Sequence, residues 1–161
     1  MRTARKCRAV KFPPFRLSYK PAGVPGTHLE EISITVDEYE AIRLVDYEEL
    51  EHQEAADKMN ISRPTLTRLV KRARNKIAIF LVECRKLDIH GGNFHFENDI
   101  AQCQDCGAFI YHEIDLQTSK CPHCGSENII SLAEKLGHGD CCREQKQVIK
   151  DSLERIEKSE E

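Results

Sequence analysis

One stretch in the middle of the chain constrains the fold more than any other. Residues 52–81 read HQEAADKMNISRPTLTRLVKRARNKIAIFL. Its apolar residues recur at the spacing typical of two helices packed across a tight turn, and the small Ala56 falls where the two helices would come closest. The apolar set is Ala55, Met59, Ile61, Leu66 and Leu69. The sequence therefore predicts a short helix, a turn and a longer helix.

Three residues between these two helices suit a turn and a helix start. Asn60 stands where the backbone usually becomes left-handed, and Asn tolerates that conformation better than most side chains. Ser62 is placed to cap the second helix through its hydroxyl, and Pro64 falls in the first turn, where a missing N–H costs nothing. We therefore expect the second helix to begin close to Ser62.

The second helix has an apolar face and a basic face. Apolar residues from Leu66 to Leu81 follow steps of three and four, which predicts a buried stripe. The remaining surface suits a helix in a DNA major groove, although a solvated basic face is the simpler alternative. The helix-packing pattern favours DNA binding. Base contacts are predicted for Arg63, Thr65, Thr67 and Arg68, and phosphate contacts for Lys71 and Arg72.

Charge is strongly segregated along the chain, although the net charge is only −3. Residues 1–29 carry seven Lys or Arg and no acids, and residues 30–60 carry eleven acids against two bases. The N-terminal segment also contains several prolines and interleaved aromatic residues. It is interpreted as a basic arm that is docked on the body, with a solvated leader as the alternative. The arm would follow the DNA phosphates or enter a minor groove, and contacts are predicted for Arg5, Lys6 and Arg8.

A helix and two strands are predicted around this unit. Thr35 and Glu38 have the spacing of a capping box, with acids that suit the positive end of a helix. Residues 29–35 alternate like a strand, and residues 87–90 are a second candidate. These two strands would pair into a small ribbon or across a dimer axis.

The chain resembles two known families in this region. The segments DEYEAIRLVDYEEL and EAADKMNISRPTLTRLVKRARNKIA are similar to region four of the sigma factors, which reads promoter DNA. Residues 2–92 more closely resemble a small prokaryotic family of predicted DNA-binding proteins of unassigned role, through RKCRAV, PAGVP, LEE, DEYEAIRL, EAADKMNISRPT, ARNKIA and IHGG. The resemblance implies a sigma-like helix-turn-helix regulator and ends at Gly91-Gly92.

Four cysteines beyond this point have metal-ligand spacing. Cys103, Cys106, Cys121 and Cys124 form two CxxC pairs, each followed by a glycine. Tetrahedral zinc fits such thiolates, and residues 108–111 and 129–132 would be strands of a zinc ribbon that needs its metal to fold. Iron in a rubredoxin-like site is the alternative, and zinc is favoured over iron.

The rest of the sequence bounds the class of protein. No apolar run approaches a membrane span or a signal peptide, so we expect a cytoplasmic protein whose eight cysteines are thiols or metal ligands rather than disulfides. Cys141 and Cys142 are interpreted as plain thiols, with a second metal or redox site as the alternative. Residues beyond 143 have a helical pattern suited either to dimerisation or to covering the ribbon.

Together these features predict a mainly α protein. The expected divisions are a basic arm with a short strand (1–34), a helix-turn-helix DNA-binding domain (35–92), a zinc ribbon (93–136) and a C-terminal helix (137–161). The predicted function is sequence-specific binding of double-stranded DNA in transcriptional control, as a homodimer. Alternatives are a metal- or redox-sensing protein and a module that binds RNA polymerase or RNA. No arrangement typical of catalysis was found, so an enzyme is not expected.

Overall fold

The structure is a computed structural model that describes residues 7–113 and 119–137. Within these ranges it contains eight strands in three sheets together with four α-helices. The prediction of a mainly α protein was therefore wrong, and the fold is mixed α/β. The reason is that strands β1, β2 and β5 are only two or three residues long, and each becomes recognisable only through a partner far away in the sequence.

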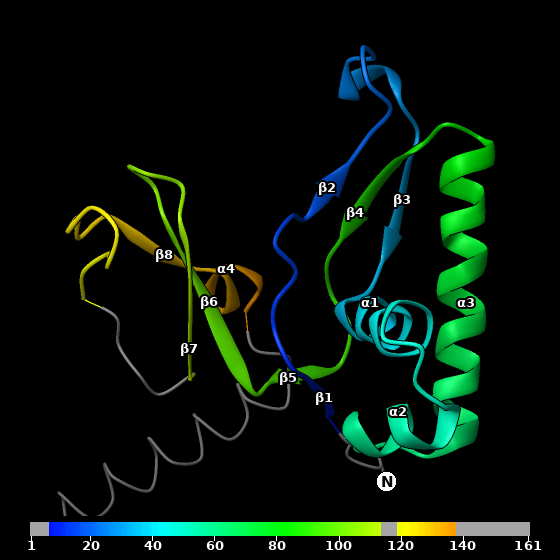
Figure 1. Cartoon of the computed structure of the whole chain (residues 1–161). Coiled ribbons are helices and arrows are strands. Elements are labelled where there is room, and N and C mark those ends of the chain that lie inside the picture. The colour runs from blue at the N-terminus through cyan, green and yellow to red at the C-terminus, as the bar shows by residue number, and fades with distance from the viewer. Residues whose placement is uncertain (1–6, 114–118, 138–161) are drawn as a thin grey trace, which may run out of the picture.

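Two small sheets join the N-terminal segment to the middle of the chain (Figure 1). Strand β1 (Arg8–Val10) pairs in parallel with β5 (Phe94–Phe96). In the second sheet, β4 (Lys86–Ile89) lies between β2 (Ser18–Tyr19) and β3 (Glu31–Ile34). The pairing of β3 with β4 confirms that the two predicted strands associate within one chain, and they do so in parallel. The segment between β2 and β3 contains the 3₁₀ turn η1 (Gly26–His28).

The helices follow the sequence prediction closely. Helix α1 (Val36–Ile42) begins with the expected capping box between Thr35 and Glu38 and continues into the π-helical turn η2 (Arg43–Tyr47). Helix α2 (His52–Lys58) and helix α3 (Arg63–Val82) are joined by a short turn. Helix α2 has its own capping box, in which Glu51 and Glu54 each satisfy a backbone N–H of the other.

The third sheet carries the four cysteines. Strand β6 (Asn98–Cys103) is central, between β7 (Phe109–Glu113) and β8 (Ile129–Ser131), and both pairs are antiparallel. Strands β7 and β8 lie where the sequence predicted the strands of a ribbon, whereas β6 was missed. The short helix α4 (Leu132–Leu136) follows β8 directly. The predicted C-terminal helix lies outside the described residues.

Two clusters of buried residues hold the molecule together. The first joins α1, η2, α2 and α3 through fully buried side chains that include Leu44, Met59, Leu66 and Leu69. The second contains residues of β1, β3, β4 and β5 together with Ala133 of α4. Because Ala133 belongs to the same buried cluster as Val10 and Phe94, the cysteine-bearing sheet is joined to the rest of the protein through a shared core.

Asp99 holds this junction in place. The carboxylate is 4% exposed and accepts hydrogen bonds from the backbone N–H groups of Ile100 (2.7 Å) and Ala133 (2.9 Å) and from the Ser131 hydroxyl. The Ser131 hydroxyl in turn accepts a bond from the N–H of Glu134 at 3.0 Å, which caps α4. A buried carboxylate bound in this way fixes α4 against β6.

Candidate functional site

The turn between α2 and α3 is shaped by its own residues and by β1. Asn60 has a φ of 55°, which confirms the predicted left-handed position. The N–H of Ile61 donates to the Ala56 carbonyl at 3.0 Å, and the N–H of Ala9 in β1 donates to the Met59 carbonyl at 3.0 Å. The N-terminal strand is therefore hydrogen-bonded directly to the end of α2.

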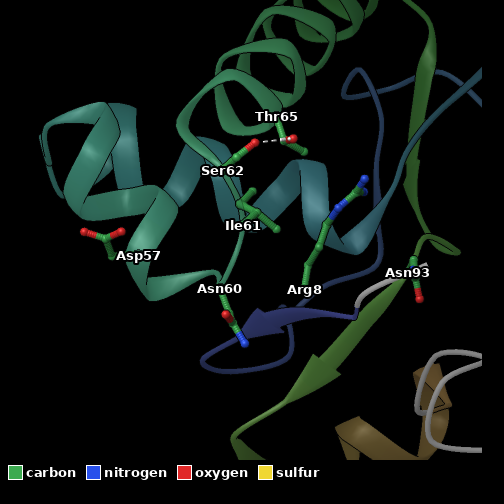
Figure 2. Close-up of a pocket in the computed structure, with 7 residues that line it drawn as sticks. All are labelled: Arg8, Asp57, Asn60, Ile61, Ser62, Thr65 and Asn93. Atoms are coloured by element: carbon green, nitrogen blue, oxygen red, sulfur yellow. Dashed lines mark hydrogen bonds between the residues drawn. The ribbon is translucent and has the colours of Figure 1, made fainter. Parts of the chain in front are cut away.

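The predicted cap of α3 differs in detail. Ser62 is the N-cap residue, but its hydroxyl forms a 2.8 Å hydrogen bond with the Thr65 hydroxyl, and no backbone N–H donates to the side chain. The two hydroxyls line an open pocket of about 500 Å³ beside the turn (Figure 2). Its other lining residues are Arg8, Asp57, Asn60, Ile61 and Asn93.

Half of the basic side chains on α3 form ion pairs with acidic residues. Arg74 contacts Asp46 at 2.6 Å, and the hydrogen bond to Asp46 raises the pKa of Arg74. Lys76 and Arg72 contact the buried Glu38 at 2.7 Å and 3.5 Å. Two carboxylates thus offset part of the positive charge of these three bases within the protein.

The other three basic residues form a different group. Arg63, Arg68 and Lys71 are exposed, and none has an ion-pair partner among the residues that the structure describes. They lie on the N-terminal half of α3, whose opposite side is buried through Leu66, Leu69 and Val70. We call Arg63, Arg68 and Lys71 the cationic patch. Sequence reasoning could not separate this patch from the other bases, because the neutralising acids lie on α1 and η2.

Two hydroxyls predicted to contact DNA bases already have partners. Thr67 donates to the Arg63 carbonyl at 3.0 Å, and its oxygen lies 3.0 Å from Nδ1 of His52. Thr65 is bonded to Ser62. Thr67 thus joins the first turn of α3 to α2, which is an alternative use of its hydroxyl.

The predicted basic arm is only partly described. Arg5 and Lys6 lie outside the described residues. Arg8 forms an ion pair with Asp37, a carboxylate that is 1% exposed. Oδ1 of Asp37 has no hydrogen-bond partner among the described residues. The charge of Arg8 therefore compensates a buried acid.

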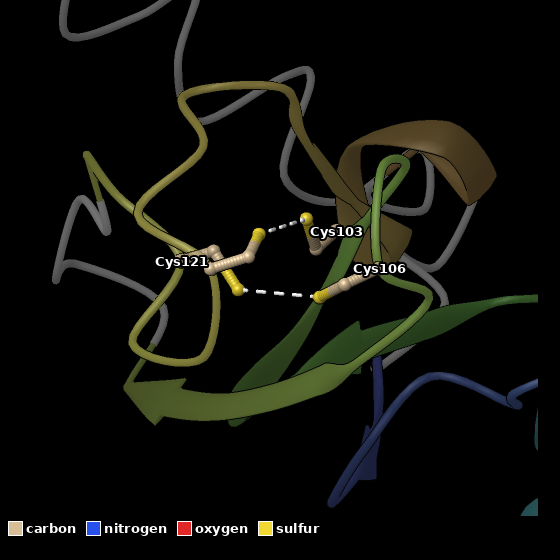
Figure 3. A group of neighbouring side chains, drawn as sticks. Cys103, Cys106 and Cys121 are labelled. Carbon is tan, nitrogen blue, oxygen red and sulfur yellow. Dashed lines mark hydrogen bonds between the residues drawn. The ribbon is translucent and has the colours of Figure 1, made fainter.

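The four predicted metal ligands come together at one end of the third sheet (Figure 3). Their sulfur atoms all lie within 4.8 Å of one another, with Cys103 3.6 Å from Cys124 and Cys106 3.7 Å from Cys121. Sulfurs bound at about 2.3 Å to one tetrahedral ion would be about 3.8 Å apart. The cluster therefore fits a single metal ion held by four thiolates.

The backbone around the cysteines shapes this cluster. Gly107 and Gly125 have φ values of 75° and 73°, and their N–H groups bond to the carbonyls of Cys103 and Cys121. These positive φ angles suit glycine and let each CxxC segment curl around one point. In addition, the N–H of Gln104 donates to the Asn128 carbonyl at 2.9 Å, which joins the first CxxC turn to the segment after the second.

The thiols influence one another strongly. Hydrogen bonds from the backbone N–H groups of Cys106 and Asp105 lower the pKa of Cys103 to about 7. The N–H of Ser126 also lowers the pKa of Cys124, but hydrogen bonding with Cys106 and Cys103, together with burial, raises it to about 12. Without a metal, one thiolate would accept hydrogen bonds from the neighbouring thiols. A metal cation bound between the four sulfurs would favour deprotonation of all four thiols.

The remaining cysteines were expected to be thiols or metal ligands. Cys84 is free and exposed. Cys7 is disulfide-bonded, so the expectation of reduced thiols was wrong for this residue. Cys141 and Cys142 lie outside the described residues. No helix among those that the structure describes is long and apolar enough to cross a membrane.

These features define a small α/β protein with a basic two-helix unit and a four-cysteine sheet of metal-binding type. Residues 1–97 match the family model described as "Protein of unknown function DUF134", and the chain belongs to this family. The match ends close to Gly92, where the family resemblance in the sequence was expected to end.

Curated relatives extend the similarity into the cysteine-bearing half. A UPF0251 protein of Chloroherpeton thalassium is 50% identical over 112 residues, which are 70% of this chain and 74% of the relative. The UPF0251 protein of Desulforudis audaxviator is 40% identical over 131 residues (81% and 86%), and that of Moorella thermoacetica is 39% identical over 140 residues (85% and 90%). No solved structure matches the chain.

Proposed function

We propose that this protein binds double-stranded DNA through α3 and regulates transcription, with a structural zinc ion in the third sheet. The observation that carries the proposal is the cationic patch of Arg63, Arg68 and Lys71. Three exposed cations stand on a helix whose other side is anchored to α2 by buried apolar contacts, and none of the three forms an ion pair with the part of the chain that the structure describes. Helices presented in this way are the ones that enter a major groove.

The distribution of charge supports a particular orientation on DNA. Asp46 and Glu38 pair with Arg74 and Lys76, so the cations of α3 that have no ion-pair partner among the described residues lie on its N-terminal half. The first turn of α3 contains no acidic residue, so its N–H groups and the positive end of the helix suit a nearby phosphate. The helix would therefore meet the duplex with its N-terminal end.

The proposal includes a homodimer and zinc. One recognition helix reads only a few base pairs, so a second copy would supply the remaining specificity. The four-thiolate set suits zinc and also accepts iron. Metal analysis of the purified protein tests this assignment: we expect one zinc per chain and no absorption in the visible range, and a red, reducible iron centre would contradict it.

Alanine substitutions in α3 test the DNA-binding proposal. Arg68→Ala should lower affinity for a selected duplex by about 1–3 kcal/mol and relax its sequence preference. Lys71→Ala should weaken all duplexes alike and reduce the slope of log K against log salt by about 0.9, the value for one phosphate contact. The measurement is fluorescence anisotropy with a selected and a scrambled duplex over a range of salt concentrations.

Arg74→Ala is the matched control for both substitutions. It removes the same kind of side chain from the same helix, but one that is paired with Asp46 and only weakly available to a phosphate. Its affinity and salt slope should stay close to those of the unmodified protein. If Arg74→Ala reduced binding as much as Arg68→Ala, or if duplex selection enriched no sequence, the proposed interface would be rejected.

A further inference from the structure

A second surface, on the sheet that bears the cysteines, has a composition of its own. The strand register places Gln102 of β6 opposite both Phe109 of β7 and Ile130 of β8, and Ile100 opposite Tyr111. Residues that face each other in antiparallel strands project to the same side of a sheet. Phe109, Tyr111 and Ile130 therefore share one side of the sheet.

A segment of the N-terminal region lies against this side. Phe15 contacts Phe109 and Tyr111 edge to face, with ring centroids 4.9 Å and 6.2 Å apart, and Phe12 contacts Tyr111 at 5.6 Å. Despite these contacts, Phe15 is 41%, Tyr111 59% and Ile130 42% exposed. We call Phe12, Phe15, Phe109, Tyr111 and Ile130 the aromatic face.

Two cations accompany these rings. The Arg16 guanidinium lies 5.6 Å from the centre of the Phe109 ring, and Nζ of Lys11 lies 5.7 Å from the centre of the Phe12 ring. Both side chains are otherwise exposed to solvent. A cation beside an aromatic ring is weakly attracted to it, which holds the charge at the edge of the aromatic face.

We propose that the aromatic face binds a single strand of DNA, with unpaired bases stacking on Tyr111 and Phe15 and the phosphates close to Arg16 and Lys11. Exposed rings with flanking cations are the components with which proteins hold single strands, since every base offers a flat apolar surface and every nucleotide a negative charge. An apolar protein partner would use the rings but would have no need of the two cations.

The site is separate from the proposed duplex site. The sheet β7-β6-β8 and helix α3 lie on opposite sides of the molecule (Figure 1). The choice of DNA rather than RNA rests on the proposed function of α3, whereas the preference for an unpaired strand rests on the aromatic face alone. Variants of the two surfaces can therefore be tested independently.

Binding of a fluorescein-labelled oligothymidylate of about twelve nucleotides to the full chain tests the proposal. Tyr111→Ala and Phe15→Ala should each weaken binding roughly 5- to 150-fold, the range for the loss of one stacked base. Tyr47→Ala is the matched control, because Tyr47 is 83% exposed but lies in η2. That variant should bind the oligonucleotide like the unmodified protein. Arg68→Ala should also retain single-strand binding while its affinity for the selected duplex falls roughly 5- to 150-fold, which corresponds to about 1–3 kcal/mol.

A second substitution, Tyr111→Trp, distinguishes loss of base stacking from misfolding of the Tyr111→Ala variant. It keeps a ring at the same position, so binding should persist, and because the chain contains no other Trp the new fluorescence should be quenched by the oligonucleotide. The proposal would be overturned by unchanged affinity in both alanine variants or by absence of quenching. It would also be overturned if the protein bound oligouridylate more tightly than oligothymidylate. A dimer of the unmodified protein that dissociates on Tyr111→Ala substitution would overturn it as well, because the aromatic face would then be an interface between two copies.

Discussion

Replacing Cys103 or Cys121 with serine, or removing the metal with a chelator, should unfold the sheet β7-β6-β8. Structural zinc contributes an apparent binding free energy of about 10–16 kcal/mol in small domains, as much as the total stability of many proteins. Strands β6 to β8 bury few apolar residues of their own, and both CxxC turns end at one four-sulfur cluster. Without the metal, little remains to hold the two turns together.

Amide hydrogen exchange can measure this effect residue by residue. The N–H groups of Cys103 and Gln104 donate to the carbonyls of Ala108 and Asn128 at 2.9 Å, and their exchange should become fast when the metal is removed. Amides of α2 and α3 should keep their protection, because their cluster of buried residues contains no residue of the third sheet. The Ala9 amide, bonded to Met59, should show an intermediate loss, since β1 belongs to the core shared with Ala133.

Cys84→Ser is the matched control for this experiment. Cys84 is a free and exposed cysteine outside the sulfur cluster, so its replacement should leave exchange rates and metal content unchanged. Slow exchange at Cys103 and Gln104 in the metal-free protein would mean that the sheet folds without an ion. In that case the four cysteines would not have the structural role assigned to them.

Local signals in the sequence predicted the helical part of the fold well. The Thr35–Glu38 capping box, the left-handed Asn60 and the buried Leu66 and Leu69 depend on residues within one or two helical turns of each other. Such features are encoded by spacing and side-chain chemistry alone. The spacing of the four cysteines is equally local within each pair, and the four sulfurs do converge.

Features that depend on distant partners could not be predicted in this way. Strand β1 is three residues long and pairs with a strand more than eighty residues away, so neither segment has a recognisable period. For the same reason the sequence showed six bases on α3 but not that Glu38 and Asp46 form ion pairs with three of them. The mixed α/β fold and the limits of the cationic patch are both consequences of tertiary contacts.

Arg8→Ala should destabilise the folded protein by about 3–5 kcal/mol, the usual effect of removing one partner from a buried ion pair. Asp37 is 1% exposed, and its Oδ1 has no hydrogen-bond partner among the described residues, so the carboxylate would keep its charge with little compensation. Denaturant unfolding measures the change. Lys58→Ala, which removes an exposed contact of 3.8 Å with Glu48, should change stability by less than about 0.5 kcal/mol.

The double variant Arg8→Ala with Asp37→Asn separates the ion pair from other contacts of Arg8. Neutralising the acid removes the uncompensated charge, so the double variant should regain part of the stability lost by Arg8→Ala. Additive losses from the two substitutions would instead mean that Arg8 stabilises the fold through contacts unrelated to Asp37.

The same variant separates two roles predicted for Arg8. If the Arg8 charge serves only the ion pair with Asp37, the folded Arg8→Ala variant should bind duplex DNA with an unchanged salt slope. Any decrease in the amount of DNA bound should then equal the fraction of the variant that is unfolded. A phosphate contact would instead lower the slope by about 0.9 under conditions where the variant is fully folded. A reduced slope would mean that Arg8 contacts a DNA phosphate, as the sequence predicted, and that its ion pair with Asp37 opens when DNA binds.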